Sequence, residues 1–232
     1  METKKCIWME AGAVEYQLCP LKLNCDLCEF HQEMISGSKT QAQLSDASRF
    51  PIRIPDTSIL EFTAGVQFLQ GHFWYKRVAR GRIQLGIDSF LWQLFSSLKK
   101  VITPKLNAQI LAKQCFGWLL IEGGIVYLKS PIQGSILRIN PLFLQESIHD
   151  PHLYLVPQAD LWLVEMEVDE LEEHERLTKD GYLSMVASSK AQFDALIEGD
   201  HSSSPTPRNS RLDKNGFSIF IKSISADHIY IC

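Results

Sequence analysis

Residues 116–134 have the sequence FGWLLIEGGIVYLKSPIQG, which contains the strongest structural signal in the chain. Two apolar runs, residues 116–121 and 125–128, flank the pair Gly123-Gly124, and glycine readily adopts the positive φ angles of tight turns. Aromatic and β-branched residues in both runs favour strands. Ser130-Pro131 then marks a second turn. The stretch therefore predicts a β-hairpin, followed by a turn and another strand.

Similar short strands are predicted on the N-terminal side of this hairpin. Residues 73–78 and 82–87 have strand composition and are separated by a turn through residues 79–81. Asp88 or Ser89 can then cap a helix, because a short polar side chain accepts hydrogen bonds from the first free backbone amides. The apolar residues that follow have the spacing of one buried helical stripe: Phe90, Leu91, Leu94, Phe95 and Leu98.

The C-terminal third contains both helical and strand-like patterns. Residues 161–166 favour a strand, and residues 170–183 favour a helix, with a further helical stretch to about Ile197. Residues 201–207 are rich in Ser and Pro and predict a flexible break. Residues 216–221 and 228–231 alternate between apolar and polar side chains, so they are predicted to pair as strands.

The overall composition excludes several classes of protein. The chain has 232 residues, 45% of them hydrophobic, and a net charge of −4 without a cluster of basic residues, which argues against nucleic acid as a partner. The longest apolar run, residues 116–128, is interrupted by Glu122 and is too short to span a membrane. No signal-peptide pattern occurs at the N-terminus, so a cytoplasmic protein is expected.

The cysteines are unevenly distributed, because four of the six fall within the first 28 residues: Cys6, Cys19, Cys25 and Cys28. In a reducing cytoplasm such a group is typical of a metal site. The Cys25-x2-Cys28 spacing can direct two thiolates to one ion, and the other two cysteines can complete a tetrahedron. A structural zinc ion is the leading interpretation, and an iron–sulfur cluster, a thiol pair and unliganded thiols are the alternatives.

Three other features have a plain structural interpretation. His31 could replace a cysteine as a ligand, but a solvated helical residue is the commoner case. Cys115 lies beside Phe116 in an apolar stretch and is expected to be a small buried side chain. The acidic residues between Glu165 and Glu175 are expected to form a solvated face, with a docking patch for a basic partner as the alternative.

The middle of the chain resembles the glycine cleavage system H protein family. The resemblance rests on short motifs in the family's order: Gly71-His72-Phe73-Trp74, Leu85-Gly86-Ile87-Asp88, Phe116-Gly117, Ser130-Pro131-Ile132-Gln133-Gly134 and Leu161-Trp162-Leu163-Val164. It implies a mainly β fold with α-helices, the lipoyl-like barrel-sandwich hybrid, with the cysteine-rich module added at its N-terminus.

In that family a lysine at the hairpin tip receives lipoate as an amide, and the resulting arm carries an aminomethyl group between enzymes. Counted from Phe116-Gly117 or from Ser130-Pro131, Gly123 takes the lysine's place, in the tip Glu122-Gly123-Gly124. Glycine offers no amine to acylate, so lipoate is not expected. Leu120 stands where the family has an acidic residue, whereas Gly134 matches a family glycine.

These observations predict a non-catalytic docking module related to the glycine cleavage system, with protein partners such as glycine-cleavage-type or lipoate-related enzymes. No nucleophile elbow, dinucleotide-binding fingerprint or zincin motif occurs in the sequence, so an enzyme is not expected. Two alternatives are a metal- or redox-sensing protein acting through the N-terminal cysteines, and a true lipoyl carrier that uses another lysine, such as Lys129.

The predicted organisation has four parts. Residues 1–34 form the cysteine-rich, metal-binding head, and residues 35–58 form a polar linker. Residues 59–185 form the domain that resembles H protein. Residues 186–232 form a C-terminal helix and tail.

Overall fold

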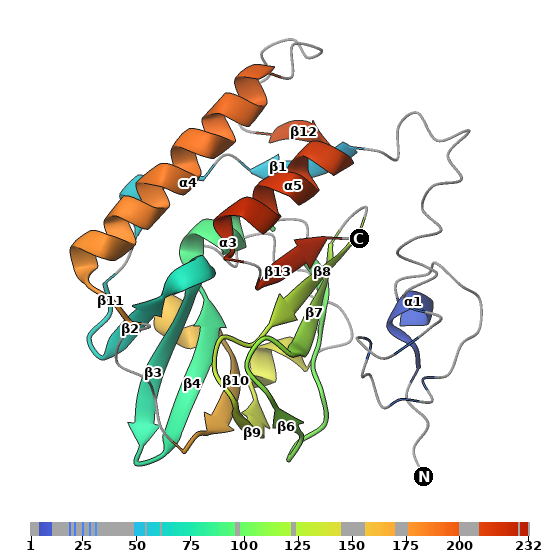
Figure 1. Ribbon diagram of the computed structural model, residues 1–232, viewed down its shortest axis with the longest axis vertical. Helices are drawn as coiled ribbons and strands as arrows, with labels where there is room; N and C mark the ends of the chain where they lie inside the picture. The colour runs from blue at the N-terminus through green and yellow to red at the C-terminus, as the bar shows by residue number, and fades with distance from the viewer. Residues whose placement is uncertain are drawn as a thin grey trace.

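A computed structural model describes residues 5–10, 19, 21, 25, 28, 31, 49–53, 55–60, 62–95, 98–121, 124–144, 156–169, 176–199, 209–226 and 228–231. The fold is mainly β with a few helices, as predicted from the sequence (Figure 1). Its two main sheets pack as a barrel-sandwich hybrid. No helix among the described residues is long and apolar enough to cross a membrane.

The larger sheet has seven strands in the order β11-β2-β3-β4-β10-β9-β6. Their bounds are β2 (Val66–Leu69), β3 (Phe73–Ala79), β4 (Arg82–Ile87), β6 (Gln109–Ile110), β9 (Gly134–Ile139), β10 (Trp162–Glu167) and β11 (Arg176–Leu177). All of its strand pairs are antiparallel. Gly134 is required where β9 approaches β10, because a Cβ atom there would lie 2.3 Å from the backbone oxygen of Glu167.

The smaller sheet has four strands in the order β13-β8-β7-β5. It consists of β5 (Leu98–Ile102), β7 (Cys115–Ile121), β8 (Gly124–Lys129) and β13 (Ile229–Ile231). A separate two-stranded ribbon joins β1 (Arg49–Arg53) to β12 (Asn209–Asp213). The segment predicted as a linker thus contains a strand, β1, whose partner lies far along the chain.

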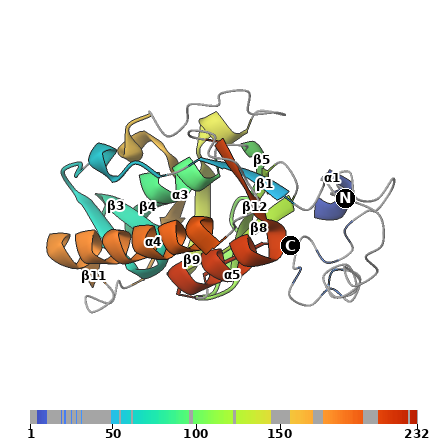
Figure 2. The same ribbon diagram turned by 90° about the horizontal axis from the view of Figure 1, so that it is seen from above.

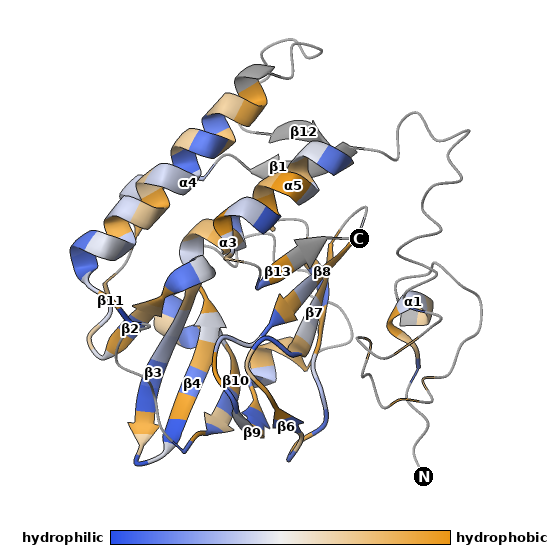
Figure 3. Cartoon of the chain, in the orientation of Figure 1, coloured by the Kyte–Doolittle hydropathy of each residue, from blue (hydrophilic) through white to orange (hydrophobic). Residues whose placement is uncertain are grey.

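Three helices lie across one end of the sheets: α3 (Ser89–Leu94), α4 (Lys179–Gly199) and α5 (Lys214–Ile224) (Figure 2). The short helix α1 (Ile7–Glu10) lies apart from them. The chain also has short 3-10 turns: η3 (Thr57–Ile59), η4 (Gln70–His72), η5 (Pro141–Phe143) and η7 (Gln158–Asp160). Asp88 caps α3, since its side chain accepts a hydrogen bond from the Leu91 amide at 3.0 Å. Hydrophilic and hydrophobic residues alternate along α4 (Figure 3).

One hydrophobic core connects both sheets with the helices. Phe73 and Leu85 of the larger sheet and Phe116 of the smaller one are fully buried in it, as are Phe193 of α4 and Phe217 of α5. The C-terminal elements are therefore part of the packing of the sandwich. The predicted boundary between the H-protein-like domain and the C-terminal part, at residue 185, falls inside helix α4. The described structure therefore has no break at that position.

Most elements predicted from the sequence occur in the structure. The strand–turn–strand at residues 73–87, the helix capped by Asp88 and the strand near Leu163 are confirmed. The prediction of a strand at residues 216–221 was wrong, because these residues lie in α5. The helix predicted through Leu98 ends at Leu94, and Leu98 begins β5.

Candidate functional site

The central hairpin consists of β7 and β8. These strands pair antiparallel, and their last paired residues at the turn are Ile121 and Gly124. The predicted hairpin is thus confirmed, while Glu122 and Gly123 themselves lie outside the described residues. Lys129 lies at the other end of β8, where it pairs with Cys115.

Both edges of this hairpin are occupied by other strands. On one side β5 pairs with β7, with Val101 opposite Leu119. On the other side β13 pairs with β8, with Ile229 opposite Leu128. The Lys129 amide also donates a hydrogen bond to the His228 carbonyl oxygen at 2.7 Å. The hairpin is therefore the middle of a four-stranded sheet.

The hairpin is also buried on both faces, since every residue of β7 is buried. One face carries Phe116, Leu119, Ile121, Val126 and Leu128 into the main core. The other, which we call the outer face, carries Cys115, Trp118, Leu120, Ile125 and Tyr127 into a second cluster. A register shift between Cys115 and Gly117 changes the strand alternation, so Cys115 shares a face with Trp118.

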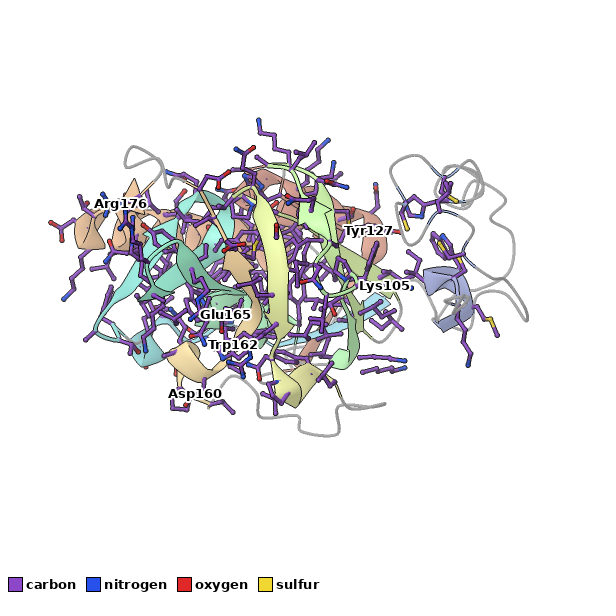
Figure 4. All side chains as sticks on the ribbon, turned by 90° about the horizontal axis from the view of Figure 1, so that it is seen from below. Lys105, Tyr127, Asp160, Trp162, Glu165 and Arg176 are labelled. Atoms are coloured by element: carbon purple, nitrogen blue, oxygen red, sulfur yellow. The ribbon has the colours of Figure 1, made fainter. Side chains whose placement is uncertain are left out.

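The outer face is covered by the cysteine-rich head. Cys6, Ile7, Trp8 and Cys25 of the head are buried in the same cluster as the outer-face residues. Tyr127 lies on the side of the barrel that faces this head (Figure 4). Burial of a large apolar side chain contributes about 1.5 to 3 kcal/mol, so these contacts favour the docking of the head on the hairpin.

His31 is the polar link between head and hairpin. The indole N–H of Trp8 donates a hydrogen bond to His31 Nδ1 at 3.1 Å, and the Tyr127 hydroxyl lies 3.1 Å from the same nitrogen. Because an indole nitrogen can only donate, Nδ1 must be unprotonated and accept this bond. His31 is buried and contacts both aromatic rings. The solvated position expected from the sequence was therefore wrong.

The four head cysteines form no disulfide with one another, and they lie close enough for their charges to interact. The Cys28 amide donates to the Cys25 carbonyl oxygen at 3.1 Å, so the Cys-x2-Cys segment turns back on itself. Burial raises the pKa of the Cys25 thiol, and neighbouring thiols raise it further: Cys115, Cys19, Cys28 and Cys6. Burial likewise raises the pKa of Cys6, although the backbone amides of Trp8 and Met9 oppose the shift.

The thiols do not have the geometry of a preformed metal site. Within the described part of the chain, no three His, Cys, Asp or Glu side chains are grouped so that they could hold a metal ion. A cation would have to draw the cysteine-bearing segments together.

A second buried polar cluster lies beneath α4. His72 Nδ1 is 2.8 Å from an Asp88 carboxylate oxygen, and His72 Nε2 is 2.8 Å from the Ser189 hydroxyl. The Tyr182 hydroxyl donates to the same Asp88 oxygen at 3.0 Å. The order Ser–His–Asp matches that of a hydrolase triad. However, Ser189 is only 2% exposed and the other two residues are fully buried, so the cluster links α4 to the barrel.

Sequence reasoning did not identify the contact between head and hairpin. One signal for it was present, because residues 115–121 form an unbroken apolar run. A strand that is exposed on one face alternates between polar and apolar residues, whereas a continuous run indicates cover on both faces. The identity of the covering residues, Trp8 and His31, could not be read from the run itself.

The chain was compared with known proteins. No family model matches it. Two glycine cleavage system H proteins are similar in sequence. That of Geobacillus thermodenitrificans (strain NG80-2) is 27% identical over 124 residues, and that of Anoxybacillus flavithermus (strain DSM 21510 / WK1) is 26% identical over 124 residues. Each match covers 52% of this chain and 93% of the relative.

Among solved structures, a glycine cleavage system H protein from Mycobacterium marinum aligns with a TM-score of 0.46 and 18% identity, covering 54% of this chain and 99% of that one. The similarity in sequence supports an H-protein-like relationship for about half of the chain.

Proposed function

We propose that this chain is a non-catalytic docking module related to glycine cleavage system H proteins, and that it carries no lipoyl group. The observation behind the proposal is the register of the central hairpin. Ile121 pairs with Gly124, and the two residues between them in the sequence are Glu122 and Gly123. Neither side chain has the primary amine to which lipoate is attached.

The alternative acceptor, Lys129, is poorly placed for this chemistry. It pairs with Cys115 at the end of β8 remote from the tip. Its backbone amide donates a hydrogen bond to the His228 carbonyl oxygen. A lysine within a paired strand does not project as a residue at a tight turn does. The module therefore acts by binding proteins, with glycine-cleavage-type or lipoate-related enzymes as the partner class.

Intact mass measurement tests the absence of lipoate. The full chain is co-expressed with a lipoate-attaching enzyme, beside the variants Gly123→Lys and Lys129→Arg. We expect the unmodified mass for the natural chain and for Lys129→Arg, while Gly123→Lys reports whether the tip can be reached by the enzyme. A lipoyl adduct on the natural chain, mapped to any lysine, would refute the proposal.

We further propose that the head binds one structural zinc ion through Cys6, Cys19, Cys25 and Cys28. The gathering of these thiols in one part of the molecule supports this. A metal- or redox-sensing role is the second candidate function, and it predicts that peroxide releases the metal and alters partner binding. Metal analysis of the reduced protein, before and after peroxide, distinguishes a structural ion from a sensor.

A further inference from the structure

Basic side chains are concentrated around the turn between β3 and β4. Residues 76–82, which we call the basic turn, have the sequence KRVARGR, so four of the seven are Lys or Arg, against 23 of 232 in the whole chain. No Asp or Glu occurs between Phe62 and Ile87, a range that contains all of β2, β3 and β4. These strands are neighbours in the larger sheet. The basic turn is thus an exception to the even distribution of basic residues along the chain.

The backbone of the basic turn is fixed by hydrogen bonds. Ala79 pairs with Arg82, so only residues 80 and 81 connect the two strands. The Gly81 carbonyl oxygen also accepts a hydrogen bond at 2.8 Å from the amide of Val168, just after β10. The turn lies at the end of the sheet remote from α3 and α5 (Figure 1). Side chains held on such a turn lose little backbone freedom when a partner binds them.

Three cations of the basic turn have no acidic partner. Arg77 and Arg80 are exposed and Lys76 is half-buried, and none of them takes part in an ion pair among the residues that the structure describes. Val78 lies at a register shift between Arg77 and Ala79, and its side chain is 41% exposed. The basic turn therefore combines unpaired positive charge with an exposed apolar side chain.

The fourth cation, Arg82, is in a different situation because it faces an acidic residue. Its guanidinium lies 3.5 Å from one carboxylate oxygen of Glu165, and that of Arg138 lies 3.4 Å from the other. The Glu165 side chain is only 5% exposed, so the two arginines compensate a buried charge. Glu167 and Asp169 follow along the same part of the chain and are exposed. The acidic residues thus lie on the β10 side of β4, which leaves the β3 side with an excess of positive charge.

We propose that the basic turn is a docking site, through Lys76, Arg77 and Arg80, for a protein whose surface carries carboxylates around an apolar side chain. The inference rests on the proposed docking function and gives the chemistry of the partner. Opposite charges steer association and select the partner, while Val78 supplies apolar contact. A nucleic acid fits less well, because the chain has a net charge of −4 and three unpaired cations cannot follow a phosphate backbone.

Binding of a fluorescently labelled synthetic peptide of glutamate and leucine to the full-length protein, followed by anisotropy, tests this site. We expect Arg77→Gln/Arg80→Gln to weaken binding about fivefold or more, since each exposed contact between opposite charges contributes up to about fivefold in affinity. The matched control is Lys99→Gln/Lys105→Gln, which removes the same charge from two exposed lysines outside the basic turn. It should weaken binding less than about twofold, because distant charges are screened by salt.

A charge exchange provides a second measurement. The same peptide with lysine in place of glutamate should bind more tightly to Arg77→Glu/Arg80→Glu than to the natural chain. All these substitutions alter exposed side chains, so the variants should keep the thermal unfolding midpoint of the natural chain.

Several outcomes would overturn the inference. Equal weakening in the two glutamine variants would show that only the net charge of the chain matters, and the site also fails if the acidic peptide does not bind the natural chain. Duplex DNA and phosphatidylglycerol vesicles are titrated beside the peptide, and tighter binding of either, lost in Arg77→Gln/Arg80→Gln, would replace the protein partner with a nucleic acid or a membrane. A lipoyl adduct in the intact mass would refute the proposed function, whereas failed peptide binding with an unmodified mass refutes only this inference.

Discussion

Two buried tyrosines differ in whether their hydroxyl groups are satisfied. The Tyr182 hydroxyl donates to the Asp88 carboxylate at 3.0 Å, within the cluster that joins α4 to the barrel. The Tyr75 hydroxyl is also buried, but it has no hydrogen-bond partner among the described residues. Loss of a hydrogen bond to a charged group destabilises a protein by about 1.5 to 3 kcal/mol, whereas removal of an unsatisfied hydroxyl is neutral or favourable.

We therefore expect Tyr182→Phe to lower the free energy of unfolding by about 1.5 to 3 kcal/mol and Tyr75→Phe to leave it unchanged or raise it. Urea denaturation of both variants measures the difference. Equal losses in the two variants would show that ring packing, and not the hydrogen bond to Asp88, determines the effect.

The raised pKa of Tyr182 also predicts that the stability of the fold decreases at alkaline pH. Burial, the charge of Asp88 and the hydrogen bond all raise the pKa of Tyr182. Above pH ~10 a tyrosine in the unfolded chain ionises while Tyr182 stays protonated, so the folded state loses stability as the pH rises. This loss should be smaller in Tyr182→Phe than in the natural chain.

At the scale of elements, the strands of the barrel differ in how closely their backbones approach. Gly134 begins β9, and a Cβ atom there would lie 2.3 Å from the Glu167 oxygen at the end of β10. Gly117 lies within β7, and a Cβ atom there would lie 3.5 Å from the Ile102 oxygen, an ordinary contact. The sequence alone does not distinguish the two glycines, but only at Gly134 would a side chain clash with the neighbouring backbone.

We expect Gly134→Ala to destabilise the fold by about 1 to 3 kcal/mol, because β9 must move away from β10. Gly117→Ala should change stability by less than about 0.5 kcal/mol. Thermal unfolding of the two variants tests this pair. A tolerated alanine at residue 134 would mean that the two strands separate more easily than the packing indicates.

Elements with local signals could be predicted from the sequence, and those defined by distant contacts could not. The hairpin and the helix capped by Asp88 have turn and capping residues next to them in the chain. In α5, Phe217, Ile221 and Ile224 have helical spacing and are buried, but alternation over the short segment 216–221 gave the wrong period. Cys115 lies on the outer face because of the register shift in β7, and no local sequence motif indicates that shift.

At the scale of the whole molecule, the C-terminal segment is part of the sandwich. Ile229 of β13, the edge strand of the smaller sheet, is fully buried in the main core, whereas Ile219 of α5 is 63% exposed. If β13 contributes to the core, Ile229→Ala should lower the free energy of unfolding by about 2 to 5 kcal/mol. Ile219→Ala should have an effect within about 0.5 kcal/mol.

A single unfolding transition that shifts for Ile229→Ala would show that the tail and the barrel unfold together. An unchanged midpoint would instead mean that β13 detaches before the barrel unfolds. Chemical denaturation followed by tryptophan fluorescence measures both outcomes, because Trp118 is buried in β7, which pairs with β8 on the side opposite β13.

The pairings of β8 with β13 and of β1 with β12 also bear on how the chain is made. During translation β8 and β1 are synthesised well before β13 and β12. Until β13 and β12 emerge, the backbone amides and carbonyls that pair with them can form hydrogen bonds with strands of other nascent chains. Contacts so distant in sequence form slowly. The period of synthesis, more than the life of the finished molecule, is therefore when this protein is most exposed to aggregation.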